Sequence, residues 1–371
     1  MAYQIVPYVS DLEPQIIELQ THLWSRDAAR NAAYFRWKYV DNPYVDASLI
    51  QLTLCSRRVV AMRGMFGAMW EVDDPTARHF MPYADDFVVA PAHRNRGVAS
   101  QVMQASVAET ARRGFPFAVS LSAGPVTFVG SLATGWRSAG AYQSVWRDSA
   151  WSPPLRRRLD RLHTRAYGRL KLAFDALHPA GPFARLDRGS RHITGPLSLR
   201  RAPRAAEMAA LVARLPWDGR IRHVRDADYL AWRFGNPLHD YRFLFWDDGG
   251  LQGYLVLQRY VSDRADRGCV NIVDWEASSE AIRTGLLTAA LRAGRFTRLH
   301  TWTVSASEPL RILLRDQGFV AVEPAGVQAR RGGLLVRRLD AANRDAPWML
   351  GSRSLLRIAE WDLRMLYSMA G

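Results

Sequence analysis

The sequence has few cysteines and no long hydrophobic run. Its 371 residues include two cysteines, Cys55 and Cys269, which make no disulfide framework and predict a reducing compartment such as the cytoplasm. Neither cysteine has a partner at metal-ligand spacing, so no zinc site is expected. No run of about 18 apolar residues occurs, and the N-terminus lacks a basic segment followed by an apolar one, so neither a membrane span nor a secretory signal is expected.

Lysine is almost absent, whereas arginine is abundant. The net charge is +15, and the only lysines are Lys38 and Lys171. About two thirds of the excess lies in residues 151–205, where thirteen arginines and lysines face three aspartates. Leucines and arginines recur there at the spacing of a basic amphipathic helix. Its basic face has three interpretations: a solvated linker, contact with an anionic membrane surface or acceptor, and nucleic-acid binding, which no base-reading motif supports.

Two segments of the chain occur twice, at offsets of about 195 and 183 residues. YFRWKYVDNP begins at Tyr34 and YLAWRFGNP at Tyr229. FAVSLSAGPVTFVGSLATGW ends at Trp136 and HTWTVSASEPLRILLRDQGF at Phe319, and each predicts a strand, a serine-rich turn, a helix and a Gly-aromatic pair. A duplicated domain explains both pairs of similar segments. The predicted parts are an α/β domain at 1–150, a connector at 151–195, a second domain at 196–345 and a tail at 346–371.

The sequence DDFVVAPAHRNRGVAS, which begins at Asp85, changes from a strand to a helix. The first N–H groups of a helix have no partners, and the macrodipole is positive there, so this end of a helix stabilises a phosphate. Small residues allow a ligand to approach the backbone closely. The predicted anion site therefore consists of Arg94, Asn95, Arg96, Gly97, Val98, Ala99 and Ser100.

The second half lacks this combination. Residues 270–294 again predict a strand followed by a helix, but without the glycine and the two arginines. Glu276 and Glu280 are expected where a phosphate would bind, and they repel an anion. The sequence therefore predicts one anion site in the chain, in the first half.

The first half resembles the GNAT superfamily of N-acetyltransferases, whose main motif is Gln/Arg-x-x-Gly-x-Gly/Ala after the fourth strand. Residues 94–99 match this motif, and the preceding V-x-P and the later pair Gly135-Trp136 also fit. LLRDQGF, which ends at Phe319, resembles the same fold without the motif. The resemblance implies a mixed-sheet α+β fold in each half, a degenerate second domain, acetyl-CoA or another acyl-CoA as donor, and no metal.

The resemblance also implies roles for particular residues. Backbone amides of residues 96–100 bind the pyrophosphate, and the two arginines of the turn add charge-assisted contacts to it. The strand edge at Val88 and Val89 pairs with pantetheine. The Val89 N–H stabilises the oxyanion. The base is a carboxylate, Asp86 or Asp85; strand alternation puts the two on opposite faces, and Asp86 is favoured.

The family often has a tyrosine as general acid, at the position that is Ser131 in this chain. Tyr142 lies just beyond, but no spacing argument places it at the leaving thiolate. Solvent protonates the thiolate in such a case.

The aromatic residues of the first repeat have two interpretations, core packing and an acceptor site. Their recurrence in the half without the anion motif favours the core. In the second interpretation, Arg36 and Lys38 contact an anionic acceptor. The aromatic residues are Tyr34, Phe35, Trp37 and Tyr39.

The preferred function is an acyl-CoA-dependent N-acyltransferase that acts on a primary amine, such as an amino sugar or the amine of a secondary metabolite. Two alternatives stay open: an aminoacyl-tRNA-dependent transferase of the same fold, which the basic connector would suit, and a non-catalytic acyl-CoA-binding module. The expected partner is a small amine, and a homodimer is left open.

Overall fold

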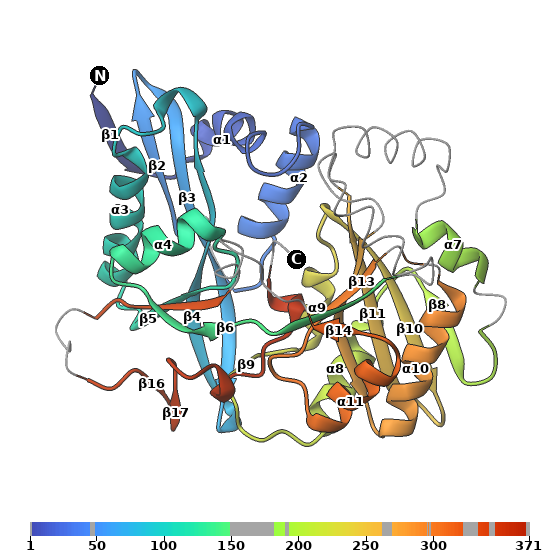
Figure 1. Cartoon of the computed structure of the whole chain (residues 1–371). Coiled ribbons are helices and arrows are strands. Elements are labelled where there is room, and N and C mark those ends of the chain that lie inside the picture. Colours follow the sequence, from blue (N-terminus) through green and yellow to red (C-terminus); the bar gives the residue numbers. More distant parts are fainter. Residues whose placement is uncertain are drawn as a thin grey trace.

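The chain forms two mixed sheets covered by helices, which Figure 1 shows side by side. The computed structural model describes residues 2–44, 49–148, 182–189, 193–261, 269–294, 296, 298–321, 333–340 and 346–368. Most of the predicted basic connector, residues 151–181 and 190–192, lies outside the described residues. No helix in the described ranges is long and apolar enough to cross a membrane.

The first sheet has eight strands among the described residues. Its order is β1-β2-β3-β4-β5-β15-β6, with β9 paired to β3, and only the pair β4 and β5 is parallel. The strands are β1 (Tyr3–Pro7), β2 (Ile50–Cys55), β3 (Arg58–Val72), β4 (Asp74–Val89), β5 (Phe117–Ser120), β6 (Arg137–Ala141), β9 (Arg222–His223) and β15 (Gly333–Arg338).

The second sheet has seven strands among the described residues, in the order β14-β7-β13-β12-β11-β10-β8. Here β12 and β13 form the parallel pair. The strands are β7 (Ser144–Asp148), β8 (Leu197–Arg200), β10 (His239–Asp247), β11 (Leu251–Tyr260), β12 (Cys269–Ala277), β13 (Arg298–Trp302) and β14 (Val320–Ala321); β16 (Met349–Leu350) and β17 (Arg353–Ser354) form a separate hairpin.

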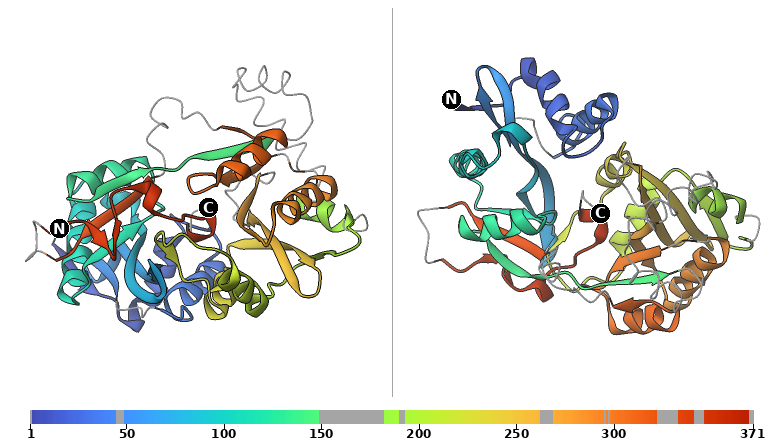
Figure 2. Two further views of the ribbon diagram at one scale, coloured as in Figure 1. Left: turned by 90° about the horizontal axis from the view of Figure 1, so that it is seen from below. Right: turned by 45° about the horizontal axis from the view of Figure 1, so that its top comes forward.

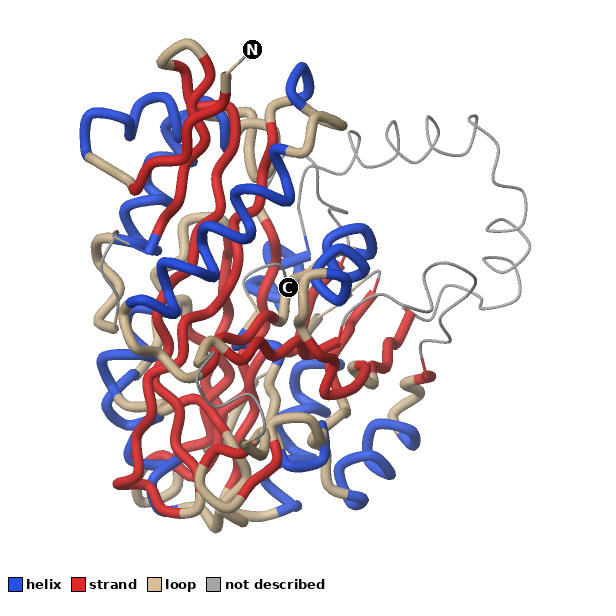
Figure 3. The backbone as a smooth tube through the Cα atoms, turned by 90° about the vertical axis from the view of Figure 1, so that its left-hand side faces the viewer, coloured by secondary structure: helices blue, strands red, loops and turns tan. Residues whose placement is uncertain are grey.

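Helices cover both faces of the first sheet (Figure 3). In β3, Ala61 packs with Val98 and Val102, whereas the neighbouring Met62 packs in the core that also contains Ile16 and Phe35. Successive residues of a strand point to opposite faces, so these two groups of helices lie on opposite sides. The helices of the two halves are α1 (Glu13–Gln20), α2 (Ala28–Tyr39), α3 (Val98–Arg112), α4 (Pro125–Ala133), α7 (Pro182–Gly189), α8 (Ala205–Arg214), α9 (Ala227–Arg233), α10 (Glu280–Ala293) and α11 (Glu308–Asp316).

Each sheet contains an interior strand from the other half of the sequence, and the two-residue β9 of the second half also pairs with β3 of the first sheet. β7, which follows β6, pairs with β13 and β14 of the second sheet. β15, near the C-terminus, lies between β5 and β6 of the first sheet. In Figure 1 the green chain after β6 crosses to the second half, and the orange-red β15 lies beside β5. The predicted domain boundaries near residues 150 and 345 stay a prediction, but each sheet takes an interior strand from the other side of them.

We expect that neither half folds alone, because each would lack an interior strand of its own sheet. A protease site introduced within residues 149–181 and then cleaved should leave the two pieces together in size-exclusion chromatography, with one urea transition. Each half expressed alone should be insoluble or lack a cooperative transition, and co-expression should restore folding. A single half that unfolds cooperatively would contradict this expectation.

The repeated aromatic segments meet at the interface between the halves. The indoles of Trp37 and Trp232 are stacked, with ring centroids 4.7 Å apart and planes 7° apart. Trp37 Nε1 donates to the Trp232 carbonyl at 2.6 Å, and Trp232 Nε1 donates to the Trp37 carbonyl at 2.7 Å. Reciprocal contacts of this kind relate the two repeats by an approximate two-fold axis. The four aromatic residues of the first repeat are buried, as the core interpretation predicts.

The predicted tail is part of the folded structure. Trp361 and Tyr367 are fully buried, and Tyr367 ends the short 3-10 helix η7 (Met365–Tyr367). Arg233 of α9 donates from Nε to the Leu366 carbonyl at 2.8 Å and from Nη2 to the Ser368 carbonyl at 3.0 Å. The last described residues, up to Ser368, therefore lie between the two halves (Figure 2).

Candidate active site

The parallel strands β4 and β5 separate after one pair of residues. The pair is Tyr83 and Val119, and both strands continue beyond it without further pairing. The gap leaves backbone hydrogen-bonding groups on the facing edges without a strand partner, which is an edge that an extended ligand can pair with. Asp85 follows on the β4 side of the gap and Ser122 on the β5 side.

The predicted anion turn lies at the far end of β4. Gly97 forms the N-cap of α3 with φ of 77°, and no side chain caps this helix. A Cβ at Gly97 would meet only Gln101 Nε2, at 3.9 Å, so the space beside the turn is open. The first amides of α3 are thus available to a ligand, at the positive end of the helix dipole.

The backbone of Val89 faces the gap. The Ala90 N–H donates to the Val60 carbonyl of β3 at 2.8 Å. The backbone N–H and C=O groups of every second residue of a strand point to the same side, so the N–H and C=O of Val88 also face β3. The N–H and C=O of Val89 therefore point away from β3, and the Val89 carbonyl accepts from Arg94 Nε at 3.1 Å. Of the two predicted pantetheine contacts, Val89 is therefore the one directed into the gap.

Asp85 and Asp86 do not lie on opposite faces, contrary to the prediction from strand alternation. Arg63 pairs with Phe87 and Gly64 with Asp85, so Asp86 is an extra residue in a β-bulge, with φ of 40°. The bulge interrupts the alternation and turns both carboxylates toward one ammonium group.

That ammonium belongs to Lys38 of α2, which is fully buried. Its Nζ donates to Asp85 Oδ2 at 2.6 Å, to Asp86 Oδ1 at 2.8 Å and to Tyr34 Oη at 3.1 Å, which uses its three protons. Burial lowers the pKa of Lys38, but the charges of Asp85 and Asp86 outweigh this and raise it above its usual value. The interpretation that Lys38 contacts an anionic acceptor is therefore wrong; Arg36 of the same helix is exposed.

Asp86 is enclosed by donors. Besides Lys38, its oxygens accept from Trp24 Nε1 at 3.0 Å, Tyr39 Oη at 2.9 Å and Gln20 Nε2 at 3.4 Å. Its exposed fraction is 1%. Burial raises the pKa of its carboxyl, although the charge of Lys38 opposes the shift.

Asp85 has a second partner that sequence reasoning missed. Ser122 Oγ, half-buried in the turn after β5, donates to Asp85 Oδ1 at 2.6 Å. The signal for this residue was present in the repeat, because the serine-rich turn that contains Ser122 recurs in the second half. We call Lys38, Asp85, Asp86 and Ser122 the Lys–Asp cluster.

Of the two residues considered for proton donation, Ser131 is buried in α4, whereas Tyr142 bonds to the residue before Ser122. Ser131 of α4 is 2% exposed. Tyr142 donates to the Leu121 carbonyl at 3.2 Å and stacks on Trp302 of the second half, with ring centroids 4.1 Å apart. Burial raises the pKa of Tyr142 well above its usual value.

The second half differs at the corresponding places. Its helix α10 is capped by Ser279, whose side chain accepts from the Ile282 N–H, and Glu280 stands in the first turn. Glu276 is not at the turn but in β12, where it is buried between Arg225, at 2.7 Å, and Arg364, at 2.8 Å. This end of α10 is thus less suited to an anion than that of α3.

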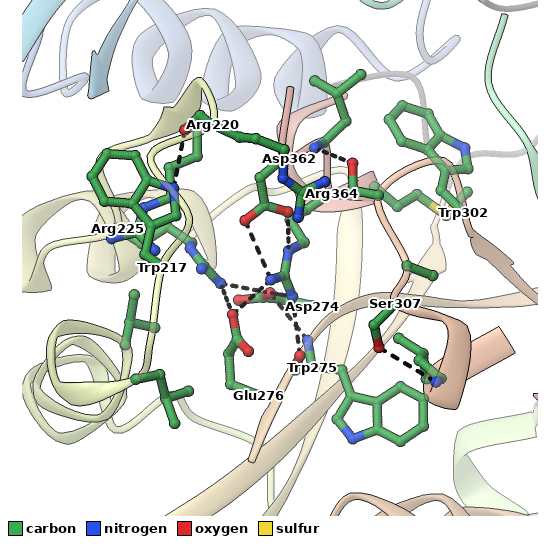
Figure 4. A pocket seen from close by; sticks show the side chains of 18 of the residues that line it. Trp217, Arg220, Arg225, Asp274, Trp275, Glu276, Trp302, Ser307, Asp362 and Arg364 are labelled. Carbon is green, nitrogen blue, oxygen red and sulfur yellow. Dashed lines mark hydrogen bonds and ion pairs between the residues drawn. The ribbon is translucent and has the colours of Figure 1, made fainter. Parts of the chain in front are cut away.

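The gap between β12 and β13 contains the C-terminal segment and a cavity of about 410 Å³. Arg364 Nη1 donates to the Trp275 carbonyl of β12 at 3.0 Å. Figure 4 shows Arg225 and Arg364 beside a group of carboxylates. Burial raises the pKa of Glu276, but the charges of Arg364 and Arg225 outweigh this and lower it. Against the effect of burial, the same two charges also lower the pKa of Asp362, to about 2. The carboxylates are Asp274, Glu276 and Asp362.

Comparison with protein-family models gives a match in the second half. Residues 217–338 match the model of the acetyltransferase (GNAT) domain family. No curated protein matches the sequence. Among the described residues, no group of three or more side chains could hold a metal ion.

Several solved structures share the fold at low sequence identity. A probable N-acyltransferase of unknown function from Enterococcus faecalis V583 aligns with a TM-score of 0.57 at 10% identity, over 91% of this chain and 73% of that one. A GCN5-related N-acetyltransferase from Anabaena variabilis gives 0.56 at 13%, over 91% and 73%. A tandem GNAT protein from the clavulanic acid biosynthesis pathway gives 0.52 at 13%, over 91% and 99%.

Proposed function

Because the chain has the tandem GNAT fold and contains a GNAT acetyltransferase domain, we propose that it is an acyl-CoA-dependent N-acyltransferase with its working site in the first half. The observation that carries this proposal is the combination of two features on β4. One is the uncapped glycine turn at the start of α3, and the other is the gap that opens between β4 and β5. Together they suit a ligand with a phosphate at one end and an extended amide chain.

The turn holds the pyrophosphate of the donor. The N–H groups of Val98, Ala99 and Ser100 belong to the first turn of α3 and lack helical acceptors. Gly97 lets the phosphate approach the backbone, and the guanidinium groups of Arg94 and Arg96 add charge. The residues proposed for this role extend from Arg94 through Asn95 to Ser100.

The edge of β4 aligns the acyl group for attack by an amine. Pantetheine amides pair with the strand edge at Val89, and the Val89 N–H stabilises the oxyanion of the tetrahedral intermediate. The Lys–Asp cluster lies at the closed end of the gap and contributes the base, through Asp85 or Asp86. Because Ser131 is buried, solvent protonates the leaving thiolate.

A small primary amine is the proposed acceptor. The chain aligns with 99% of a tandem GNAT protein from the clavulanic acid biosynthesis pathway, which supports an acceptor such as an amino sugar or a secondary-metabolite amine. The second half is proposed to bind no acyl-CoA. Ser279 caps its helix, and Arg364 uses a carbonyl of its open strand edge.

Titration calorimetry with acetyl-CoA is expected to show about one site per chain. The reason is the contrast between the uncapped α3 and the capped α10. Release of CoA thiol in the presence of a panel of primary amines then reports turnover. Two equivalent sites per chain, or none, would overturn the proposal, and binding without turnover on any amine would favour a non-catalytic acyl-CoA-binding module.

A further inference from the structure

Ser122 is the member of the Lys–Asp cluster closest to solvent. Its hydroxyl donates to Asp85 Oδ1 at 2.6 Å, and in the described part of the chain it has no second hydrogen-bond partner. Lys38 and Asp86 are 0% and 1% exposed, whereas Ser122 is half-buried. Since a hydroxyl has two lone pairs as well as one proton, Ser122 can accept a further hydrogen bond on its open side.

The second half shows what the equivalent serine does with that capacity. Ser305 lies 183 residues after Ser122, at the same place in the repeated strand–turn–helix segment. Its Oγ accepts from the Leu363 N–H at 2.6 Å and donates to the Trp361 carbonyl at 3.0 Å. In that half the serine therefore binds a nitrogen that carries a proton and a carbonyl oxygen of the chain's own C-terminal segment.

In the first half, Asp85 replaces the carbonyl as the acceptor of the serine proton. The remaining position on Ser122, which in Ser305 is filled by an N–H donor, is then directed to an exogenous nitrogen. The acceptor amine of the proposed reaction supplies such a nitrogen.

The contacts of the cluster make Asp85 the carboxylate that a proton can reach through this serine. Lys38 shares its positive charge between Asp85 and Asp86, and the buried guanidinium of Arg63 also interacts with both carboxylates. Entry is through Asp85, because Asp85 is bonded to the half-buried Ser122, whereas the described partners of Asp86 are all buried side chains.

We propose that Ser122 is the catalytic residue that contacts the acceptor amine and relays its proton to Asp85, with Lys38 and Asp86 as positioning residues. The inference rests on the proposed function. The amine nitrogen bonds to the thioester carbonyl carbon, and its proton passes to Ser122 Oγ as the serine proton passes to Asp85 Oδ1. The carbon–sulfur bond then breaks, its electron pair leaves on the sulfur as CoA thiolate, and Asp85 returns its proton to water.

The test compares Ser122→Ala with Ser305→Ala, which removes the matching hydroxyl from the second half. For the amine with the highest turnover, Ser122→Ala should lower kcat at pH 7 by about 100-fold or more, with the Kd for acetyl-CoA unchanged. Ser305→Ala should stay within about threefold of the wild type. Ser122→Thr, which keeps a hydroxyl, should recover most of the rate.

A pH profile separates a proton relay from a structural role. The deficit of Ser122→Ala should shrink between pH 7 and pH 9, because hydroxide replaces the lost relay, whereas a structural defect would lower the rate equally at every pH. Asp85→Asn should give a loss of similar size, and the double variant no more than either single one, because both belong to one path. The ionisable side chains that interact with Asp85 are Lys38, Tyr34, Tyr39, Arg63, Tyr83 and Asp86.

The outcomes distinguish the two proposals. Full activity of Ser122→Ala, a deficit that does not depend on pH, or multiplicative losses in the double variant would each overturn the relay while leaving the acyltransferase intact. A wild-type protein that neither binds acetyl-CoA nor acylates any amine would overturn both. Loss of the cooperative urea transition in Ser122→Ala would make Asp85→Asn, whose side chain keeps the same shape, the deciding variant.

Discussion

Glutamate in place of Gly97 is expected to weaken acetyl-CoA binding by at least about 100-fold. Gly97 has φ of 77°, a conformation that costs another residue about 1–2 kcal/mol, and the new side chain would enter the open space at the start of α3. Its carboxylate would compete with the pyrophosphate for the free amides and repel it. Titration calorimetry measures the loss of affinity, and far-UV circular dichroism checks that the fold is retained.

Gly114 provides a matched control at the other end of the same helix. Its φ is 83°, it is exposed, and a Cβ would meet nothing within 4 Å. Gly114→Glu therefore introduces the same backbone strain and the same charge, away from the anion turn, and should leave the Kd unchanged. If both variants lost affinity equally, the phosphate site would not be at Gly97.

The second large effect is expected from Lys38→Met, which should lower the free energy of unfolding by about 3–5 kcal/mol at neutral pH. The substitution leaves Asp85 and Asp86 buried side by side without their shared cation, and removing one partner of a buried ion pair has a cost of this size. Burial already raises the pKa of Asp86 in the wild type, and the loss of Lys38 removes the charge that opposes this shift. Urea unfolding monitored by tryptophan fluorescence measures the change.

The pH dependence of that loss has a definite sign. A carboxyl with a raised pKa in the folded state binds more protons folded than unfolded, so stability falls as the pH rises above the unfolded pKa of about 3.9. The deficit of Lys38→Met should therefore be larger at pH 8 than at pH 5. Arg36→Met, on the exposed side of the same helix, should cost less than about 0.5 kcal/mol. Equal losses for the two variants would mean that the cluster contributes no ion pairing to stability.

Features that depend on neighbouring residues in the sequence were predictable. The anion turn is such a feature, because a glycine before a helix and the absence of a capping side chain can both be seen in residues 94–100. The duplication was also visible, and the face-to-face contact of Trp37 with Trp232 agrees with it. The tandem mixed-sheet fold is confirmed by the family match and by the solved structures.

Features that depend on pairing between distant strands were not predictable. The bulge at Asp86 arises from the register of β4 against β3, and no pattern in the neighbouring sequence predicts it. For the same reason, the expectation that the two carboxylates point apart failed. Lys38 lies 47 residues before Asp85, so their ion pair also required the tertiary structure. The exchange of β7 and β15 is invisible to a local pattern, since either strand would fit its own sheet equally well.

The exchanged strands and the reciprocal tryptophans have the arrangement expected of a strand-swapped dimer of two identical subunits. Two identical single-domain subunits that swap their last strands about a two-fold axis form an isologous dimer, in which each residue contact occurs twice. Joining the end of one subunit to the start of the other preserves every contact and makes the dimer a single gene product. From that point the two copies are free to diverge. In this chain the first copy keeps the open turn at Gly97. In the second copy, Arg364 of the C-terminal segment bonds to the open edge of β12.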